Sequence, residues 1–255
     1  MLTKSSLYNV LLSRWQVIKD GDGEIVYLFG PNQMPIKIDD QTHVFQWFTW
    51  LKAENLPENI EEFLDALPEQ DLSRLQYSSL LTYGDFSGAE EAKIRLHSIC
   101  HTGDIFGSQR CDCGSQFREA LKRIVAFGAG GLFYLADHEG RGIGLFSKAL
   151  TYALQEEGLD TAEANKALGL AIDQRSYHEA VLVLKWLRNK PIILLSNNPD
   201  KVQFLSDGGV FVSGVEPLMG EVSEYNHFYL ATKADVFLRD IKLPEKIVNK
   251  KGWAL

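Results

Sequence analysis

Apolar and polar positions are arranged differently before and after about residue 78. In the first part, Trp15-Gln-Val-Ile-Lys19 and Glu24-Ile-Val-Tyr-Leu-Phe29 flank the stretch Asp20-Gly-Asp-Gly23. Two runs of apolar and β-branched residues on either side of a glycine turn predict a β-hairpin. We therefore expect two antiparallel strands in this part of the chain.

Two short helices are expected after this hairpin, over about 43–55 and 58–67, because Pro57 separates them and Pro68 ends the second. The first of them carries a dense set of aromatic residues, namely Phe45, Trp47, Phe48 and Trp50. Such a cluster is typical of a core, and a dimer contact or a surface that covers a substrate is the alternative. Nothing in residues 1–78 indicates chemistry, so we interpret them as an accessory α+β segment of unknown role.

From about residue 79 onward, strand and helix patterns alternate. Residues 92–97 have the composition of a strand, and 115–127 have apolar positions at helical spacing that end at Gly128. The remaining expected elements are a strand over 131–136, helices over about 145–157, 161–169 and 176–189, a strand over 192–196, a helix over 199–207 and a strand near 210–215. This alternation predicts an α/β fold, with a mixed α/β domain over 79–240 and a C-terminal tail over 241–255.

The composition restricts the kinds of partner. With 255 residues, of which 45% are hydrophobic and 24% charged, the chain is long enough for one full α/β core. No stretch approaches the roughly 18 consecutive apolar residues of a membrane span, and the formal charge of −8 disfavours a nucleic-acid backbone as partner. No apolar leader is apparent at the start of the sequence. We therefore expect a cytoplasmic protein that binds a small ligand, without membrane or nucleic-acid partners.

All three cysteines, Cys100, Cys111 and Cys113, lie within 14 residues. Three thiolates occupy three corners of a tetrahedral zinc ion and leave the fourth for water, which is the arrangement of a catalytic zinc site. His97 and His101 flank Cys100, and either would close the site as a fourth ligand. Cysteines that only fill space in a core are the other alternative, whereas an odd number of cysteines in a cytoplasmic protein argues against a disulfide. The sequence thus predicts an open zinc site and hydrolytic chemistry.

Two junctions between a strand and a helix are candidate anion sites. Glu139-Gly-Arg-Gly-Ile-Gly144 has glycines that let a phosphate approach, a guanidinium that could bind it and a carboxylate that could accept hydrogen bonds from a purine. Ser196-Asn-Asn-Pro-Asp-Lys201 places Lys201 in a first helical turn, where a cation is unfavourable unless an anion binds beside it. A tight turn in the first case, and a solvated lysine beside an Asn198 N-cap in the second, are the alternatives.

Several short motifs follow one another in a single order: Arg95-Leu-His-Ser98, Thr102-Gly-Asp104, Arg110-Cys-Asp-Cys-Gly114, Glu139-Gly-Arg-Gly-Ile-Gly144, Tyr152-Ala-Leu-Gln155, Asp160-Thr161 with Ala164-Asn165, and Asn197-Asn-Pro199. In this order and spacing, the chain over about 83–233 resembles the GTP cyclohydrolase II family. The resemblance implies a zinc-dependent hydrolase that opens the imidazole ring of GTP. The reaction releases formate and pyrophosphate and gives a diaminopyrimidine ribosyl phosphate for riboflavin biosynthesis. The resemblance also implies a homodimer and a magnesium ion (Mg2+) on the triphosphate.

The resemblance assigns roles that spacing alone would not. From the residues themselves, Asp173-Gln-Arg175 is a polar loop and Tyr152 a buried helix residue. In the family pattern, Arg175 is a nucleophile towards the α-phosphate, Asp173 the proton acceptor and Tyr152 an orienting or proton-handling group, while zinc (Zn2+) on the three cysteines activates the water that attacks C8 of guanine. Physical chemistry alone would have Arg175 stabilise phosphate charge, because a guanidinium has a pKa above about 12. The substrate contacts carried over by position are Arg95, Leu96, His97, Ser98, Ile99, Gln116, Glu139, Gly140, Arg141, Thr161, Ser196 and Lys201.

Two positions depart from the family pattern. Ile99 stands where the family usually has glutamate, and Ser196 stands where it usually has threonine, which keeps the hydroxyl. The missing carboxylate at Ile99, next to the first cysteine, motivates a second hypothesis. It is a divergent paralogue that opens the ring without finishing the reaction, or that acts on another purine or pyrimidine, as in uracil catabolism. A third hypothesis is a non-catalytic, nucleotide-binding zinc protein whose metal site is closed by a histidine.

Overall fold

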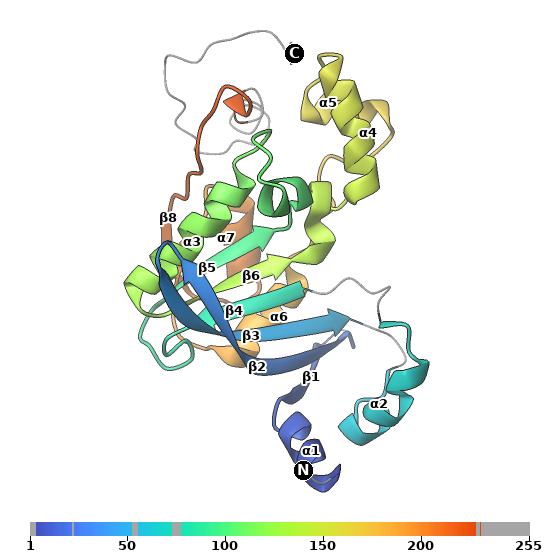
Figure 1. Cartoon of the computed structure of the whole chain (residues 1–255), viewed down its shortest axis with the longest axis vertical. Coiled ribbons are helices and arrows are strands. Elements are labelled where there is room, and N and C mark those ends of the chain that lie inside the picture. The colour runs from blue at the N-terminus through green and yellow to red at the C-terminus, as the bar shows by residue number, and fades with distance from the viewer. Residues whose placement is uncertain (1–3, 22, 53–55, 73–77, 228–229, 231–255) are drawn as a thin grey trace.

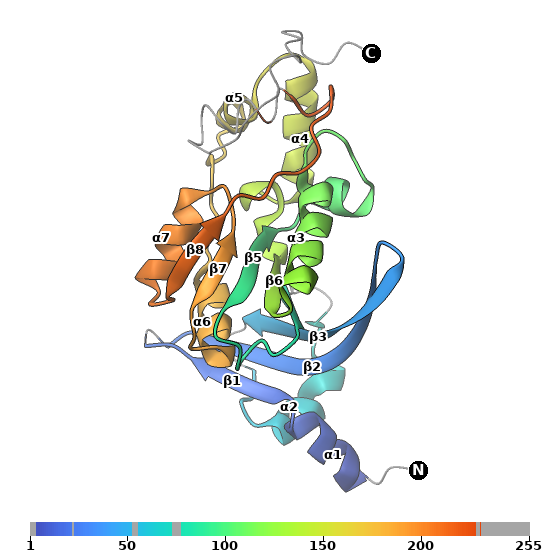
Figure 2. The same cartoon turned by 90° about the vertical axis from the view of Figure 1, so that its left-hand side faces the viewer.

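The computed structural model describes residues 4–21, 23–52, 56–72, 78–227 and 230. Within them, one eight-stranded sheet has the order β1-β2-β3-β4-β6-β5-β7-β8 (Figures 1 and 2). The strands are β1 (Trp15–Lys19), β2 (Ile25–Ile38), β3 (Gln41–Lys52), β4 (Ser78–Tyr83), β5 (Ala92–Ser98), β6 (Gly130–Leu135), β7 (Ile192–Leu195) and β8 (Val212–Glu216). The pairs from β1 to β6 along this order are antiparallel, whereas β6, β5, β7 and β8 are parallel to one another. This mixed sheet with its helices confirms the predicted α/β class.

The helices of the described residues are α1 (Lys4–Leu12), α2 (Ile60–Ala66), α3 (Cys113–Phe127), α4 (Leu145–Glu156), α5 (Thr161–Ala167), α6 (His178–Leu187) and α7 (Pro199–Asp207). α3 covers one face of the parallel strands, and α6 and α7 lie on the other face (Figure 2). α4 and α5 contact each other beyond the ends of the strands (Figure 1). None of these helices combines the length and the apolar character needed to traverse a bilayer. The parallel strands are thus buried between two helical layers, which explains their continuous apolar runs.

The expected helix over 43–55 is wrong, because residues 43–52 belong to strand β3, which pairs with β2 on one side and β4 on the other, while 53–55 lie outside the described residues. Its aromatic side chains point to both faces of the sheet. Phe48 and Trp50 pack in the core beneath α6, and Phe45 packs in the core beneath α3. Phe45 and Trp50 are 0% and 1% exposed, which confirms the expectation that the cluster is core. Aromatic side chains fit a pleated surface that is covered on both faces, and this packing decided the conformation.

Most other expected elements are confirmed in type. The hairpin of β1 and β2 is antiparallel as expected, and the helix expected over 58–67 is α2. α3 ends at Gly128, which has φ 92° and donates its N–H to the Ile124 carbonyl, as expected of a glycine cap. The strand, helix and strand expected between 192 and 215 are β7, α7 and β8. α1 has no counterpart among the expected elements.

The strands of the first 78 residues are part of the same sheet as the rest of the chain. The far ends of β2 and β3 extend past α3, where Met34, Ile36 and Ile38 pack against the core that α3 helps to form. Near the hairpin turn, His178 Nε2 of α6 donates to Asp20 Oδ2 over 2.6 Å. The division into 1–78, 79–240 and 241–255 stays a prediction, and the last of these ranges lies outside the described residues.

Candidate functional site

A pocket lies at the carboxyl ends of β5 and β6, where ligands bind in open α/β sheets. The predicted residues that line it are Arg95, His97, Ser98, Ile99, Cys100, Cys111, Cys113, Gln116, Glu139, Gly140, Arg141, Tyr152, Thr161, Arg175 and Lys201. Three predicted residues are not among its lining. Leu96 is buried in the core, Asp173 is paired with Arg175, and Ser196, just after β7, is buried with its Oγ accepting from the Asn198 N–H. Motifs that are far apart in the sequence therefore converge on one pocket.

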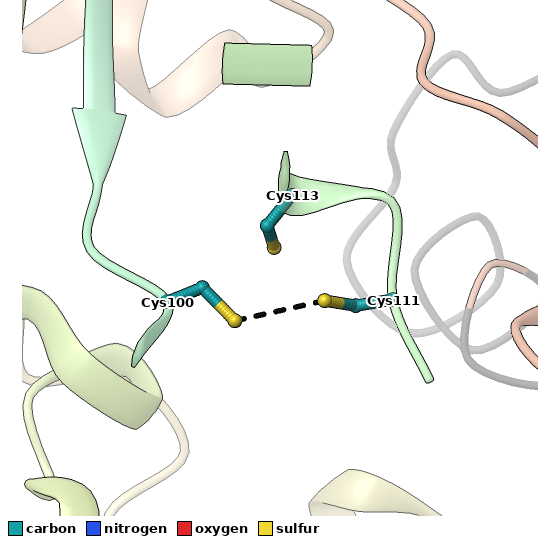
Figure 3. Close-up of side chains that lie close together, drawn as sticks. All are labelled: Cys100, Cys111 and Cys113. Atoms are coloured by element: carbon teal, nitrogen blue, oxygen red, sulfur yellow. Dashed lines mark hydrogen bonds between the residues drawn. The ribbon is translucent and has the colours of Figure 1, made fainter. Parts of the chain in front are cut away.

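The fold gathers the three thiols at the end of β5. Cys100 follows this strand, whereas Cys111 and Cys113 lie at the start of α3 and point towards it (Figure 3). The sulfur atoms of Cys100 and Cys111 are 3.6 Å apart, and all three lie within 4.8 Å of one another. The backbone at Gly103 passes so close that a Cβ there would lie 2.9 Å from Cys111 Sγ and 3.1 Å from Cys100 Sγ. Three soft sulfur donors in such a cluster fit a zinc ion.

Neither histidine that was considered as a fourth ligand joins the thiols. His97 Nε2 lies 3.1 Å from Asp104 Oδ2. The His101 backbone N–H donates to Glu139, and the His101 ring packs edge-on against Phe106. In the part of the chain that the structure describes, the cysteine-containing candidate metal group consists of three thiols alone. A zinc ion held by these three thiols would keep a fourth coordination position that none of the Cys, His, Asp and Glu side chains of the described residues fills.

The three thiols share their charge unevenly. Hydrogen bonds from Cys111 and Cys113 lower the pKa of Cys100 far below its ordinary value, and the Lys148 ammonium adds to this effect. Hydrogen bonding to Cys100 raises the pKa of Cys111 to about 12, and it raises the pKa of Cys113 as well. Cys100 is therefore the thiolate of the group, and a divalent cation would deprotonate the other two.

Lys148 on α4 is a pocket residue that the sequence reasoning missed. Its Nζ lies 3.2 Å from Cys100 Sγ and 2.7 Å from Glu139 Oε1, and its side chain is buried. Burial acts to lower the pKa of Lys148, but attraction to Cys100 and Glu139 outweighs burial and raises it. The residue is thus a fixed cation beside the thiols. The signal that could have found it is the one used for Lys201, because a lysine near a helix start opposes the helix dipole.

The carboxylate of Asp104 holds the loop that carries Cys100. Asp104 Oδ2 accepts hydrogen bonds from the Cys100 backbone N–H at 2.9 Å and from the Tyr134 hydroxyl at 3.0 Å. It also faces His97, whose pKa is lowered by burial, so the neutral ring donates its Nε2 proton to the carboxylate. The His97 ring stacks on Tyr134 with an interplanar angle of 13°. His97 therefore supports the metal loop, a role that its spacing did not indicate.

Arg175 and Asp173 form a pair at another side of the pocket. Arg175 Nε donates to Asp173 Oδ1 over 2.8 Å, and its Nη2 donates to Asp173 Oδ2. Burial acts to raise the pKa of Asp173, but the hydrogen bonds from Arg175 outweigh burial and lower it, so the carboxylate is ionised. The Arg175 side chain is only 7% exposed. A bidentate pair of this kind fixes the plane of the guanidinium.

Lys201 is buried, and the alternative of a solvated surface lysine is wrong. Lys201 is 5% exposed, and its Nζ donates to the Leu96 carbonyl over 2.7 Å. Asn198 caps α7 as expected, since its side-chain oxygen accepts from the Asp200 N–H at 3.1 Å. A buried cation at the start of a helix that borders a pocket favours the binding of an anion there.

The glycine-containing loop after β6 packs against the segment that carries Arg175. Arg141 has φ 66°, a left-handed conformation that is uncommon for a residue with a side chain. Gly142 has φ 91°, and a Cβ there would lie 3.0 Å from Gln174 Cβ. The Gln174 N–H donates to the Arg141 carbonyl over 3.0 Å. The glycines thus serve a tight turn, and the same turn places Arg141 in the pocket wall.

Side chains beside the thiols are held by polar contacts of their own. Arg95 Nη2 donates to Gln116 Oε1 over 2.6 Å. Tyr152 Oη lies 3.4 Å from Thr102 Oγ1, and the Arg110 guanidinium lies 4.0 Å from the centroid of the Tyr152 ring. Burial raises the pKa of Tyr152, so the phenol keeps its proton. Arg110, which had no predicted role beyond its motif, thus positions Tyr152 by a cation–π contact.

An α/β sheet with a three-thiol group and buried cations in one pocket is typical of a metal-dependent enzyme. Residues 69–217 match the family model described as GTP cyclohydrolase II. The chain belongs to the GTP cyclohydrolase II family, and it is an enzyme of that class. The resemblance found in the sequence motifs is thereby confirmed.

Individual relatives agree with the family match. A GTP cyclohydrolase-2 from Streptomyces coelicolor is 48% identical over 155 residues, which are 61% of this chain and 70% of that protein. A GTP cyclohydrolase-2 from Picrophilus torridus is 41% identical over 157 residues, which are 62% of this chain and 81% of that protein. A riboflavin biosynthesis protein from Vibrio vulnificus is 42% identical over 194 residues, which are 71% of this chain and 53% of that protein.

Proposed function

We propose that the pocket binds GTP and opens its guanine imidazole ring. The reaction releases formate and pyrophosphate and gives a diaminopyrimidine ribosyl phosphate for riboflavin biosynthesis. The observation that carries this proposal is that a three-thiol group and the Arg175 guanidinium border the same pocket. The family of the chain and the names of its relatives support GTP as the substrate. A metal end and a cationic end suit a ligand with a purine ring at one end and phosphates at the other.

At the metal end, Cys100, Cys111 and Cys113 would hold a zinc ion. When bound, zinc supplies a Lewis acid and makes a water nucleophilic near neutral pH. The chain's own residues prepare this end for the guanine base. Lys148 offsets the negative charge of the thiolates, and the Arg95–Gln116 pair orients the base by hydrogen bonds. Tyr152 keeps its proton, so its hydroxyl is available as a hydrogen-bond donor next to the thiols.

At the phosphate end, Arg175 takes the role that the family pattern implies: one guanidinium nitrogen forms a bond to the α-phosphorus while the bond from this phosphorus to the leaving pyrophosphate breaks. Asp173 fixes the guanidinium and accepts the proton that this nitrogen loses, and water later cleaves the nitrogen–phosphorus bond to release the nucleotide monophosphate and return the proton to Arg175. The fixed geometry of the pair supports this assignment, because a preorganised guanidinium stabilises phosphate charge without rearrangement. Arg141 and Lys201 contribute further positive charge in the same pocket. Mg2+ enters as part of the substrate, bound to the triphosphate, and neutralises the pyrophosphate that leaves. The remaining substrate contacts proposed by position are the predicted residues that line the pocket, namely His97, Ser98, Ile99, Glu139, Gly140 and Thr161.

Ile99 supports a second candidate function. It lines the pocket with an apolar side chain immediately before Cys100. Without a carboxylate at this position, the enzyme would bind a purine less specifically or release a ring-opened product before the last step. The second candidate is therefore a paralogue with partial ring opening or with another purine or pyrimidine substrate. The group of three thiols without a histidine favours both of these enzymes over a non-catalytic zinc protein.

The test is incubation of the purified, zinc-loaded protein with GTP and Mg2+, with formate, pyrophosphate and the nucleotide product measured separately. We expect all three products, and a loss of activity by more than about 10³-fold in Cys111→Ser. Circular dichroism checks that this variant keeps its fold. Ring opening without formate would favour the paralogue, and restoring glutamate with Ile99→Glu then shows whether that position is responsible. Absence of both formate and pyrophosphate, while a control enzyme turns over, would refute the proposal.

We also propose that the protein acts as a homodimer. The ground for this proposal is the resemblance of the sequence motifs to the family, which implies a homodimer. Light scattering of the purified chain at several concentrations tests it, and a mass of one chain throughout would contradict it.

A further inference from the structure

Arg175 is held from a second direction by hydrogen bonds that do not involve Asp173. Arg175 Nη1 donates to Ser98 Oγ over 3.2 Å, and Ser98 Oγ lies 3.1 Å from His138 Nδ1. On the other side of the same ring, His138 Nε2 lies 2.7 Å from the Ser176 carbonyl oxygen. Ser98 ends β5, His138 lies in the 3₁₀ helix Ala136–Arg141 that follows β6, and Ser176 precedes α6. The chain of contacts therefore joins three segments around the guanidinium.

The direction of each hydrogen bond follows from the chemistry of its partners. A carbonyl oxygen only accepts, so His138 Nε2 must carry a proton. The Asp137 carboxylate, 3.7 Å from the same nitrogen, favours the proton there as well. Burial lowers the pKa of His138 to about 4, so the ring is neutral and Nδ1 has no proton. The Ser98 hydroxyl must then donate to Nδ1, which leaves its oxygen lone pairs for the Arg175 N–H.

Packing holds the imidazole in this orientation. His138 is 1% exposed, and its ring meets the buried ring of Tyr177 edge-on, with 4.9 Å between the centroids. The Arg175 guanidinium lies 5.9 Å from the centroid of the same Tyr177 ring, and Lys201 Nζ lies 5.5 Å from it. One aromatic ring thus borders the imidazole and two of the cations proposed for phosphate binding. A rotation of His138 would disturb all of these contacts together.

We propose that His138 is a positioning residue for Arg175. By holding the Nε2–H tautomer, it makes the Ser98 hydroxyl an acceptor towards Arg175 Nη1 and so fixes the guanidinium from the side opposite to Asp173. The proposal rests on the proposed function, in which Arg175 acts on the α-phosphate. It assigns no contact between His138 and the substrate.

A series of substitutions separates positioning from simple space filling. His138→Asn places a side-chain oxygen near the position of Nδ1 and keeps an acceptor for Ser98, whereas His138→Gln places its amide near Nε2 and keeps only the Ser176 contact. We expect His138→Asn to keep most of the kcat for GTP. We expect His138→Gln and His138→Phe to lose about 10- to 100-fold in kcat, with a much smaller change in KM, because a misplaced guanidinium slows the reaction. His138→Gln as active as His138→Asn would overturn the proposal.

A double-mutant cycle tests the path through Ser98. If His138 acts through the hydroxyl, Ser98→Ala combined with His138→Phe should lose no more kcat than the worse single variant. Multiplying losses would show that the two residues act separately and would refute the path. His43→Gln is the matched control, because His43 Nδ1 also faces a hydroxyl, that of Tyr83 at 3.5 Å, but lies in the hairpin away from the pocket. This control should keep the activity of the unchanged protein.

Nuclear magnetic resonance tests the tautomer without turnover. In the zinc-loaded protein labelled with ¹⁵N-histidine, we expect the His138 proton on Nε2, with the resonance assigned by its loss in His138→Asn. Ser98→Ala should shift the Nδ1 resonance, because Nδ1 loses its donor. A proton on Nδ1, or an Nδ1 resonance indifferent to Ser98→Ala, would overturn the proposal. If the unchanged protein fails to turn over GTP, the proposed function fails, and these spectra still decide whether the hydrogen-bond chain exists.

Discussion

The metal end and the phosphate end of the pocket are built in opposite ways. The three thiols come from 14 consecutive residues and lie mainly against one another. The phosphate end takes Ser98, His138, Arg175 and Lys201 from four segments that only the folded sheet brings together. A ligand group whose members all lie in one short segment can therefore be recognised from the sequence. When the members of a group come from several strand ends, each residue lies alone in its own segment, and no local motif marks it as functional.

The largest effect is expected from Arg175→Lys, a substitution at the phosphate end of the pocket. Lysine keeps the charge but loses the planar fork that pairs with Asp173 and reaches Ser98. We expect kcat to fall by about 10²- to 10³-fold, on the scale of losing a fixed electrostatic contact in a transition state. Zinc content should not change, since the thiols are untouched.

The control for this variant is Arg123→Lys, because Arg123 on α3 also pairs with a carboxylate, that of Glu119 at 2.8 Å, on the surface. It should keep the kcat of the unchanged protein. An Arg175→Lys enzyme with near-normal kcat would show that the two ends do not divide the chemistry as proposed.

The metal end is tested next, with Lys148→Met. Its cation comes from α4 and not from the cysteine segment, so its loss measures how far the metal end depends on distant residues. We expect the affinity for zinc, measured by competition with a chelator, to fall by about 10- to 100-fold. Lys122→Met is the control, because Lys122 is an exposed lysine that pairs with Asp39 at 2.7 Å.

Lys148→Met also leaves the Glu139 carboxylate without its cation. The double variant Lys148→Met with Glu139→Gln removes that charge as well. If the loss of zinc affinity persists in the double variant, it comes from the missing contact between Lys148 and Cys100. If zinc affinity recovers fully in the double variant, the loss came from the unpaired Glu139 carboxylate, and this result would contradict the role given to Lys148.

The smallest expected effect is on the pH dependence of the unfolding free energy, through His138 at the phosphate end. Burial lowers the pKa of His138 from 6.5 to about 4, so the unfolded chain binds this proton more readily than the folded one. The stability that comes from the neutral ring is complete above about pH 6.5 and is lost as the pH falls towards 4. We expect His138→Asn to remove about 1 to 3 kcal/mol of the pH dependence of the unfolding free energy across this window.

Urea unfolding at about pH 7.5 and about pH 4.5 measures this difference. His97, whose pKa burial also lowers, keeps part of the dependence in the variant. Asp173 titrates below this window, because its pKa is lowered from 3.8. An unchanged pH dependence in His138→Asn would show that the imidazole is not held neutral by the fold.

Much of the fold could be predicted because its signals are local. The glycines between β1 and β2 predicted the antiparallel pairing of these strands. The glycine cap at Gly128 and the proline at the start of α7 likewise act on a few neighbouring residues. The helix expected over 43–55 failed because the conformation of β3 depends on partners on both sides, β2 and β4, which a local pattern does not contain. Boundaries shifted by a few residues for the same reason.

The sequence by itself indicated a three-thiol metal group, because all three cysteines lie within 14 residues, and it indicated cations after two strand ends. The collinear motifs determined the family. Only the tertiary structure decided that Lys148 contacts Cys100 and that His97 donates a hydrogen bond to Asp104. It also decided that His138 and Ser98 form the hydrogen-bond chain to Arg175. The physical reason is that hydrogen bonds and ion pairs act over a few ångströms in space, and the register of a parallel sheet, not distance along the chain, sets which side chains come that close.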